Sequence, residues 1–401
     1  MYKRQLYLYK GKVQVSSLTM VDDLLSVAKC GIDSVETNAF INAKMELKRL
    51  ILNSDKCHKL HIGQCKGSYC SKLRAHEIDM EQVLEDSYLG DIVSSSGKHH
   101  KNIKARCGKL MGVISTIMVI LNELCLGTLY FEIALLLRET MFLSVKMLNS
   151  DTWTNLTKQD IDDLESLDKL LLKRILQTSS STPNCAVFLE LGVEPVRFLI
   201  QGKILLFLHH ILTRKENELI FQVYKAQKSQ PIENDFSEIV RKDMADLDIN
   251  SYTDKDIASM SKFKWKKIVK SSIKTTALKY LLEESNGKSK MENLTYDCLQ
   301  LQEYLKSSTM SKTRKLLALK LRCRMTPVAN NQGQKIKCKL CDMGSDDQPH
   351  LINCVLLKLR CPDILSSQEE YKDLFGSDVE KIDKLTTLFE KVLREREILL
   401  Q

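Results

Sequence analysis

Apolar residues follow two different spacings along the chain, and the change falls near residue 97. Before it, short apolar runs at residues 13–20, 24–27 and 59–62 alternate with polar turns, and residues 34–52 have helical spacing. After it, the apolar positions follow the period of amphipathic helices almost throughout. The pattern predicts an α+β, predominantly helical chain.

The helical part contains four long apolar-periodic segments and a fifth at the C-terminus. The four segments cover residues 103–126, 130–148, 158–176 and 194–212. Thr157 followed by Asp160 is typical of a helix start. In the same way, Ser377-x-x-Glu380 predicts a capping box for a final helix, whose apolar face we expect to dock on the cysteine-rich segment before it.

Composition narrows the class of protein further. Glycine (15) and proline (6) are scarce in 401 residues, which argues against a turn-rich sandwich or barrel. The 13 cysteines are odd in number and scattered, and the first residues contain no apolar leader. The most apolar stretch, residues 110–148, is interrupted by charges. We therefore expect an intracellular protein of the nucleus or cytoplasm, neither secreted nor associated with a membrane.

The net charge of +9 is concentrated in two blocks. Residues 255–290 contain ten lysines and three acidic residues, and residues 306–339 contain ten basic residues and no acidic one. Such blocks favour contacts with phosphates, with nearby aromatic rings able to stack on bases, over the alternative of an ordinary charged helix face. The expected nucleic-acid contacts are Lys264, Trp265, Lys266, Lys267, Lys312, Arg314, Lys315, Lys320, Arg322 and Arg324.

A cysteine–histidine pattern near the C-terminus predicts a metal site. It reads Cys338-x2-Cys341-x8-His350-x3-Cys354, in which a close cysteine pair and a His–Cys pair supply four tetrahedral ligands. Four protein ligands leave no open position, so we expect a structural Zn²⁺. The alternatives are four unrelated side chains, or Cys361 in place of Cys354 as the fourth ligand. A looser group, Cys57, His58, His61, Cys65 and Cys70, is better explained as a packed sheet with incidental thiols.

Adjacent carboxylates at Asp22 and Asp23 follow one short apolar run and precede another. A pair on such a turn can hold a divalent ion, and polymerases use two Mg²⁺ ions to stabilise phosphoryl transfer. Aspartate is also a common turn residue, so a solvated hairpin tip is the alternative.

Taken together, these motifs resemble the later palm and thumb motifs of reverse transcriptases from non-LTR (LINE-type) retrotransposons. The match begins with Met20-Val21-Asp22-Asp23-Leu24-Leu25, Asn53-x-x-Lys56 and Tyr88-Leu89-Gly90-Asp91. It continues in the same order through residues 130–139, Trp153, residues 189–195 and the cysteine–histidine pattern. The collinear set covers nearly the whole chain.

The resemblance implies a role for each matched residue. Asp22 and Asp23 would bind catalytic Mg²⁺, and Lys56 would donate a proton near the pyrophosphate leaving group. Tyr88, Leu89 and Gly90 would form the primer grip. The partners would be an RNA template and a DNA primer or target. The implied domains are part of the palm (1–97), a helical thumb region (98–250), a basic connector (251–330), and the zinc knuckle with the C-terminal helix (331–401).

Two departures from the family pattern affect the expected activity. Met20 replaces an aromatic residue before the aspartate pair. The earlier palm motif with a further metal-binding aspartate is not found, and two-metal catalysis needs carboxylates from both places. We therefore expect this chain alone to be inactive as an RNA-directed DNA polymerase. The alternative is a non-catalytic, zinc-stabilised nucleic-acid-binding protein or a transposon remnant. A lack of upstream coding sequence in frame would favour this alternative.

Overall fold

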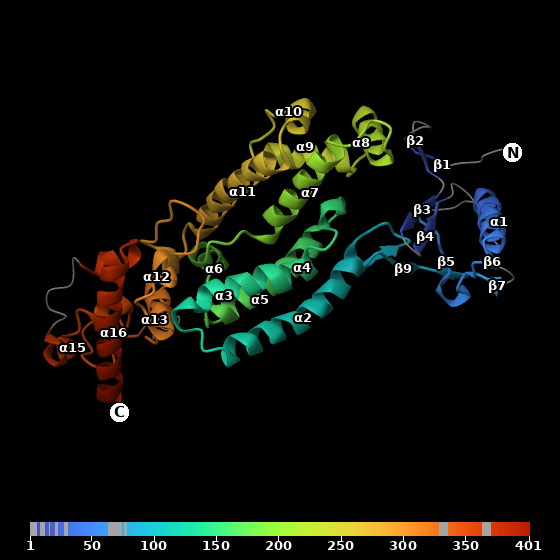
Figure 1. The fold of residues 1–401 in the computed structure, drawn as a ribbon. Coiled ribbons are helices and arrows are strands. Elements are labelled where there is room, and N and C mark those ends of the chain that lie inside the picture. The colour runs from blue at the N-terminus through green and yellow to red at the C-terminus, as the bar shows by residue number, and fades with distance from the viewer. Residues whose placement is uncertain are drawn as a thin grey trace. The chain divides into compact units, whose positions relative to one another are not determined.

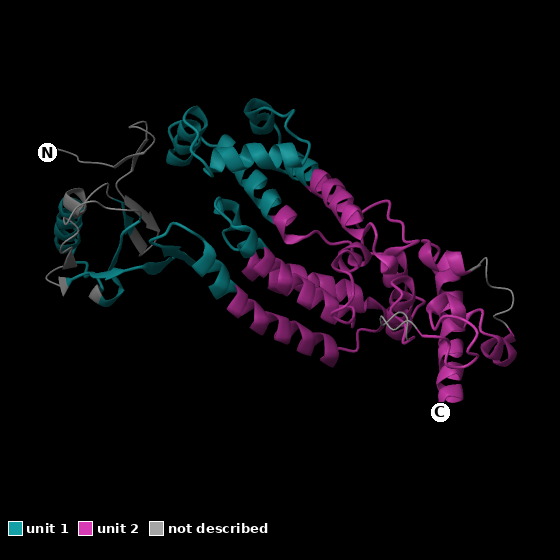
Figure 2. Ribbon diagram, turned by 180° about the vertical axis from the view of Figure 1, so that it is seen from behind, with its two compact units in different colours: residues 1–106, 148–161, 200–269 teal, residues 107–147, 162–199, 270–401 magenta. Residues whose placement is uncertain are grey.

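The computed structural model shows a predominantly helical α+β chain (Figure 1). It describes all residues except 1–5, 9–12, 16, 21–22, 28–30, 63–73, 76–77, 329–335 and 363–369. The chain divides into two compact units built from alternating stretches of sequence (Figure 2). Unit 1 contains residues 1–106, 148–161 and 200–269, and unit 2 contains residues 107–147, 162–199 and 270–401. The four consecutive domains expected from the sequence stay a prediction.

The N-terminal part of unit 1 contains the described strands, which pair two by two. Four pairs are antiparallel: β1 (Leu6–Leu8) with β2 (Val13–Val15), β3 (Ser17–Met20) with β4 (Asp23–Ser26), β6 (Arg74–Ala75) with β7 (Ile78–Asp79), and β9 (Glu85–Tyr88) with β10 (Asp91–Ser94). The remaining pair, β5 (His58–Leu60) with β8 (Glu81–Val83), is parallel. Helix α1 (Gly31–Leu47) follows β4 and the 3-10 turn η1 (Ser54–Lys56) precedes β5, which confirms the expected order of strands and helix.

These strands do not enclose a core of their own. In the described part of residues 1–97, no hydrophobic side chain is buried, and Phe40 and Leu47 on α1 are exposed. Two-stranded pairs are marginal in water without a surface to pack against. The described strands therefore form pairs without a buried core, and several large apolar side chains of this segment are exposed.

The remainder of the chain is helical, and the four long segments expected from periodicity form within a few residues of the predicted limits. The first helices are α2 (His100–Glu123), α3 (Tyr130–Leu137), a π-helical turn η3 (Arg138–Phe142), α4 (Leu143–Lys146), α5 (Lys158–Ile175), α6 (Asn184–Leu191) and α7 (Val196–Leu212). The later ones are α8 (Leu219–Ser229), α9 (Phe236–Asp246), α10 (Asp254–Ser259), α11 (Lys262–Ser285), α12 (Glu303–Lys306), α13 (Lys312–Arg322), α14 (Gln348–Leu351), α15 (Val355–Arg360) and α16 (Val379–Leu400). Short 3-10 turns are η2 (Gly127–Leu129), η4 (Ser150–Thr152), η5 (Ser289–Met291) and η8 (Glu370–Phe375).

Helix caps confirm one expected start and correct another. The Thr157 hydroxyl donates to Asp160 at 2.7 Å and accepts from the Asp160 backbone N–H at 3.2 Å. At α16, however, the N-cap is Asp378, whose carboxylate accepts from the backbone N–H groups of Glu380 and Lys381. The prediction of Ser377 as the cap was wrong by one residue, because the ionised Asp378 carboxylate is the better acceptor for the exposed N–H groups.

Within unit 1, the β9–β10 hairpin is tied to α2 by a carboxylate. Asp91 accepts a hydrogen bond from Asn102 at 2.9 Å and from Asn149 at 3.0 Å, and it forms an ion pair with Arg106. The Arg106 guanidinium also lies 5.3 Å from the ring centroid of Trp153, which is buried. This network orients the hairpin on α2.

A buried carboxylate of unit 1, Asp243 on α9, forms no ion pair with any of the described residues. Its Oδ2 atom is buried without a hydrogen-bond partner in the described structure. Burial, together with the neighbouring charge of Asp246, raises the pKa of Asp243 to about 7. The ionised form is therefore disfavoured in the folded protein.

In unit 2, a carboxylate is buried between two cations. Arg138 donates to Asp168 at 2.9 and 2.7 Å, and Lys146 donates to Asp168 at 3.0 Å. Burial alone would raise the pKa of Asp168, but the charges of Arg138 and Lys146 outweigh it and hold the pKa at about 2. Burial lowers the pKa of Lys146 to about 8. The charge of Asp168 opposes this shift only in part, because the nearby charge of Arg138 also lowers the pKa. These contacts join the π-helical turn and α4 to α5.

A second buried ionic network in unit 2 centres on Glu190 of α6. Its carboxylate accepts hydrogen bonds from the hydroxyls of Tyr296 and Tyr304, both at 2.8 Å, and from the Arg322 guanidinium at 3.1 Å. Arg322 also donates to the carbonyl oxygens of Leu374 at 2.7 Å and Gly376 at 2.9 Å. Glu190 therefore connects four separate stretches of unit 2.

Replacing Glu190 with Gln is expected to destabilise the protein by about 3–5 kcal/mol, because Arg322 stays buried without a counter-charge. Denaturant unfolding followed by circular dichroism measures the loss. The matched control Glu123→Gln, at an exposed position of α2, should change stability by less than about 0.5 kcal/mol. Equal effects of the two substitutions would contradict the role assigned to the pair.

Asp243→Asn is expected to gain stability over the wild type as pH rises. The pKa of Asp243 is higher in the folded state than in the unfolded state. Its contribution to the free energy of unfolding is therefore fully present below about pH 4 and is lost as pH rises through about 7. Thermal unfolding should show the advantage of the variant growing by roughly 1–3 kcal/mol between pH 5 and pH 8. A constant advantage, or one also seen with the exposed Asp248→Asn control, would refute this.

Candidate metal centre and nucleic-acid interface

The cysteine–histidine pattern forms one cluster in unit 2. The turn that carries the first two cysteines is closed by two backbone hydrogen bonds, from Cys338 N–H to Gly344 O at 2.7 Å and from Asp342 N–H to Cys338 O at 2.9 Å. Asp342 has a left-handed φ of 54° at this turn. The turn directs the side chains of Cys338 and Cys341 to the same side.

The four ligand atoms lie at distances that suit a single tetrahedral ion. One potential ligand atom from each of Cys338, Cys341, His350 and Cys354 lies within 4.8 Å of every other. The Sγ atoms of Cys338 and Cys354 are 4.0 Å apart, and Cys341 Sγ is 3.2 Å from His350 Nε2. Ligands bound to one zinc ion at about 2.0–2.3 Å are separated by about 3.5–3.8 Å. The cluster can therefore hold a metal ion such as zinc.

Gly344 and Asp347 determine where the His350 ring lies. A Cβ atom at Gly344 would come within 2.3 Å of His350 Nδ1, so only glycine leaves room for the ring. Asp347 is the N-cap of α14 and accepts from the His350 backbone N–H at 2.9 Å. The hydrogen bond to Asp347 thus fixes the His350 backbone, and the lack of a side chain at Gly344 leaves space for the His350 ring.

The thiols of the cluster have unequal proton affinities. Burial raises the pKa of Cys354 to about 11. Burial also acts on Cys341, but hydrogen bonds from the Met343 backbone, His350 and the other two cysteines outweigh it and lower its pKa to about 7. A set that already stabilises one thiolate is suited to a cation.

The cluster is held in place by contacts with α13 and α16. The Gln348 amide donates to Leu321 O at 2.8 Å and accepts from the Thr326 hydroxyl at 3.0 Å. Arg396 of α16 donates to Asp346 at 2.6 Å. Cys338 and Cys354 also belong to a buried cluster that includes Phe389 and Val392 of α16. The expected docking of the C-terminal helix on this segment is confirmed.

The sequence also offered two weaker metal candidates, namely Cys361 as a ligand and the cysteine–histidine group near the N-terminus. Cys361 is buried and lies outside the group of four ligand atoms. In the N-terminal group, His58 Nδ1 lies 3.0 Å from the Asp86 carboxylate, whereas Cys65 and Cys70 lie outside the described residues. In the described part of the chain, Cys354 is therefore the better fourth ligand.

The second basic block is mixed: two of its side chains are buried and others are ion-paired, which corrects the expectation of phosphate contacts for those residues, whereas Lys337 and Lys339 are exposed. Lys315 is fully buried and donates to Thr128 O at 2.6 Å, and Arg322 is buried against Glu190. Arg314 forms ion pairs with Asp383 and Glu390, and Arg324 pairs with Glu292 at 2.8 Å. Carboxylates from distant parts of the sequence thus neutralise part of a block that contains none.

Lys312 and Lys320 differ from their neighbours on α13. Both are partly exposed, and neither forms an ion pair in the described part of the chain. The Lys312 ammonium lies 3.6 Å from the ring centroid of Tyr130. They line a hollow of about 460 Å³, together with Gln177 and Leu316. These two lysines keep the expected capacity to contact an anion.

The first basic block is largely exposed, but Trp265, which we expected to contact nucleic acid, is buried. Lys264, Lys266 and Lys267 are exposed at the start of α11. Trp265 is fully buried, and its indole N–H donates to Leu205 O of α7 at 2.8 Å. Trp265 therefore packs α11 against α7 and is not available for stacking on a base. The exposed ring in this stretch is Phe263.

The expected polymerase residues are described only in part. Strands β3 and β4 are antiparallel with Met20 opposite Asp23, as expected for strands joined at the carboxylate pair. Asp22 and the side chain of Asp23 lie outside the described residues, so the Mg²⁺ site stays a prediction. Lys56 is exposed at the end of η1. Its role also stays a prediction.

The expected primer-grip residues form the tip of a tight hairpin. Tyr88 ends β9, and Leu89 and Gly90 connect it to β10 with φ angles of 50° and 85°. Both left-handed angles are those of a type I′ turn, which suits strands of normal twist. Leu89 is exposed, and its carbonyl accepts from Asn149 at 3.1 Å. The hairpin is therefore rigidly held with an exposed apolar tip.

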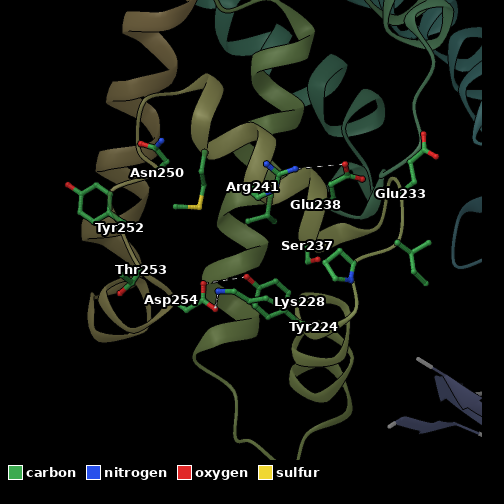
Figure 3. A pocket seen from close by; sticks show the side chains of 14 residues that line it. Tyr224, Lys228, Glu233, Ser237, Glu238, Arg241, Asn250, Tyr252, Thr253 and Asp254 are labelled. Atoms are coloured by element: carbon green, nitrogen blue, oxygen red, sulfur yellow. Dashed lines mark hydrogen bonds and ion pairs between the residues drawn. The ribbon is translucent and has the colours of Figure 1, made fainter. Parts of the chain in front are cut away.

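A hollow in unit 1 lies among α8, α9 and α10 (Figure 3). It measures about 820 Å³ and is lined by apolar residues such as Val240 and Met244. Its basic residues are paired with carboxylates: Lys228 lies 2.6 Å from Asp254, and Arg241 lies 4.0 Å from Glu238. This hollow was not anticipated from the sequence, and its paired charges do not form a catalytic arrangement.

Comparison with protein-family models, with curated proteins and with solved structures finds no match to this chain. Among the described helices, none combines the length and the apolar character that crossing a membrane requires. The assignment of a function therefore depends on the residues and the geometry above.

Substituting each cysteine in turn tests whether Cys354 or Cys361 is the fourth metal ligand. In reduced protein, Cys354→Ser should lose the bound metal, because it removes one of four converging ligands, whereas Cys361→Ser should keep about one ion per chain. Inductively coupled plasma mass spectrometry on freshly purified protein measures the content. Retention of metal by Cys354→Ser and loss by Cys361→Ser would reverse the assignment.

Gly344→Ala is expected to weaken metal affinity by about 10- to 100-fold, since the new methyl group displaces the His350 ring. Competition with a chromogenic chelator measures the affinity. Gly112→Ala, in an open position of α2, is the matched control and should leave the affinity unchanged. An unaltered affinity in Gly344→Ala would show that His350 is not a ligand.

Proposed function

We propose that this chain is the C-terminal portion of a LINE-type reverse transcriptase, in which it binds the nucleic-acid template and primer. The observation that carries the proposal is the presence of an antiparallel strand pair at each of two collinear motif positions. The β3–β4 pair flanks the Asp22–Asp23 motif, and the β9–β10 hairpin contains Tyr88-Leu89-Gly90. Both motifs therefore occur on the type of local structure that the resemblance implies.

The helical region supports a thumb-like role. Helix α2 follows directly after the second hairpin, and Asp91 of that hairpin is bonded to Asn102 and Arg106 of α2. A hairpin that touches a primer end must hold its position relative to the helices that grip the duplex. The Asp91 network supplies that rigidity in unit 1.

The exposed apolar residues of residues 25–97 also fit the proposal. Phe40, Leu47 and Leu84 are exposed, and the described part of this segment encloses no buried hydrophobic residue. Large apolar side chains left exposed beside strands without a core are expected to be covered by another polypeptide surface. In a polymerase, the remainder of the palm and the fingers would supply it.

The metal cluster contributes structure in this proposal. A Cys₃His set offers four protein ligands and no open position, so the ion would be a structural Zn²⁺. Its free energy of binding would stabilise the loop between α13 and α16. Mg²⁺, when bound at Asp22 and Asp23 in a complete enzyme, would stabilise the oxygens of the phosphoryl transfer.

The proposal is tested by binding of the full chain to a short RNA–DNA hybrid with a recessed 3′ end. A thumb predicts tighter binding to this hybrid than to a blunt DNA duplex of the same length and sequence. Fluorescence anisotropy at fixed salt measures both affinities. Equal affinities would favour a non-catalytic nucleic-acid-binding protein, and no binding to either would contradict both functions.

Salt dependence gives a further expected outcome. If roughly four lysines contact phosphates, affinity should fall about 10²-fold between about 50 and 200 mM monovalent salt. The same anisotropy titration measures the slope. An affinity that does not change across this range would show that the exposed lysines do not bind phosphates.

A further inference from the structure

The start of α11 exposes a large aromatic side chain. Phe263 is 79% exposed, whereas Trp265, two residues later, is fully buried. The two rings point to different sides because successive helical residues are about 100° apart. Only one of them is needed for packing, since Trp265 alone bonds to α7 through Leu205 O. Phe263 is thus a ring without a structural partner in the described chain.

Lysines surround this ring without neutralising partners. Lys262, Lys264, Lys266 and Lys267 are exposed, and no ion pair within the described residues involves them. Their positions oppose helix stability, because cations near a helix N-terminus and like charges at i,i+4 are both unfavourable. Folding therefore does not explain why these residues are basic.

Two neighbouring basic side chains of unit 1, His210 and Arg214, add little to this charge. Burial and the charges of Arg214 and Lys262 lower the pKa of His210, with Glu218 and Asp151 opposing them. Arg214 lies 3.9 Å from Glu218, so its charge is partly balanced. The positive charge at the start of α11 therefore comes from its own exposed lysines, and such a charge suits an anionic polymer.

We propose that the start of α11 binds single-stranded nucleic acid, with Phe263 stacking on an unpaired base and the adjacent lysines binding phosphates. Lys266 and Lys267 follow Phe263 by three and four residues, so they lie on the same side of the helix as the ring. An exposed ring can stack only on a base whose face is free, which a duplex does not offer. This inference rests on the proposed function and specifies the form of nucleic acid bound.

The first test uses the full chain and a labelled oligo(U) of about 16 nucleotides, the upper site size of common single-strand binding folds. Phe263→Ala should weaken binding by about 5- to 150-fold, which corresponds to about 1–3 kcal/mol per stacked base. Phe263→Tyr should restore it, whereas Phe263→Leu, which is apolar without a ring, should not. Affinity for a blunt duplex of equal length should change by less than about twofold.

The second test separates the charge from the ring. Replacing Lys264, Lys266 and Lys267 together with Gln should reduce the slope of log affinity against log salt by about 2, at about 0.7 per phosphate contact. The matched control replaces Lys169, Lys228 and Lys242, which are ion-paired, and should change the slope by less than 1. Phe263→Ala should leave the slope unchanged.

The outcomes distinguish this inference from the proposed function. If the chain binds nucleic acid but Phe263→Ala does not weaken oligo(U) binding, the stacking surface is overturned and the proposed function stands. If the chain binds neither hybrid, duplex nor oligo(U), the proposed function fails with it. If Phe263→Ala abolishes binding to phosphatidylserine vesicles and leaves oligo(U) binding intact, the surface recognises a membrane and the inference is overturned.

Discussion

The buried ion pair between Glu190 and Arg322 is the interaction on which the architecture of unit 2 depends. Both side chains are almost completely inaccessible, and they are 132 residues apart in sequence. Charges taken out of water are tolerated only when their hydrogen-bonding capacity is satisfied. Two tyrosine hydroxyls and two backbone carbonyls complete the set here. These hydrogen bonds form only if α6, α12, α13 and the 374–376 turn are all packed in their correct relative positions.

The same constraint explains Gly192, two residues after Glu190. Its φ is 64°, and a Cβ atom there would come within 1.9 Å of the Gln300 backbone. The segment that supplies Tyr296 and Tyr304 thus passes directly against the end of α6. The Leu-Glu-Leu-Gly stretch at residues 189–192 is explained by this crossing, which needs both a carboxylate and a residue without a side chain.

Local features of the fold were predictable from the sequence, because they depend on neighbours in the chain. Helical periodicity located α2, α5 and α7, and the Thr157–Asp160 pair located a helix start. The metal cluster was also predictable, since ligand spacing alone brings thiolates together on a short loop. The burial of Lys315, Arg322 and Trp265 was not, because it depends on partners more than 50 residues away.

Basic residues in one block of sequence can therefore differ entirely in what they do. On α13, buried or paired cations hold unit 2 together, and substituting them would lower stability before it revealed any effect on binding. At the start of α11, the lysines are exposed and form no ion pair with the part of the chain that the structure describes. A loss of affinity there can be attributed to the surface itself, since substitutions at exposed positions seldom alter stability by more than about 0.5 kcal/mol. Exposed basic side chains that form no ion pair are therefore a more reliable indicator of an anionic ligand than the density of basic residues along the sequence.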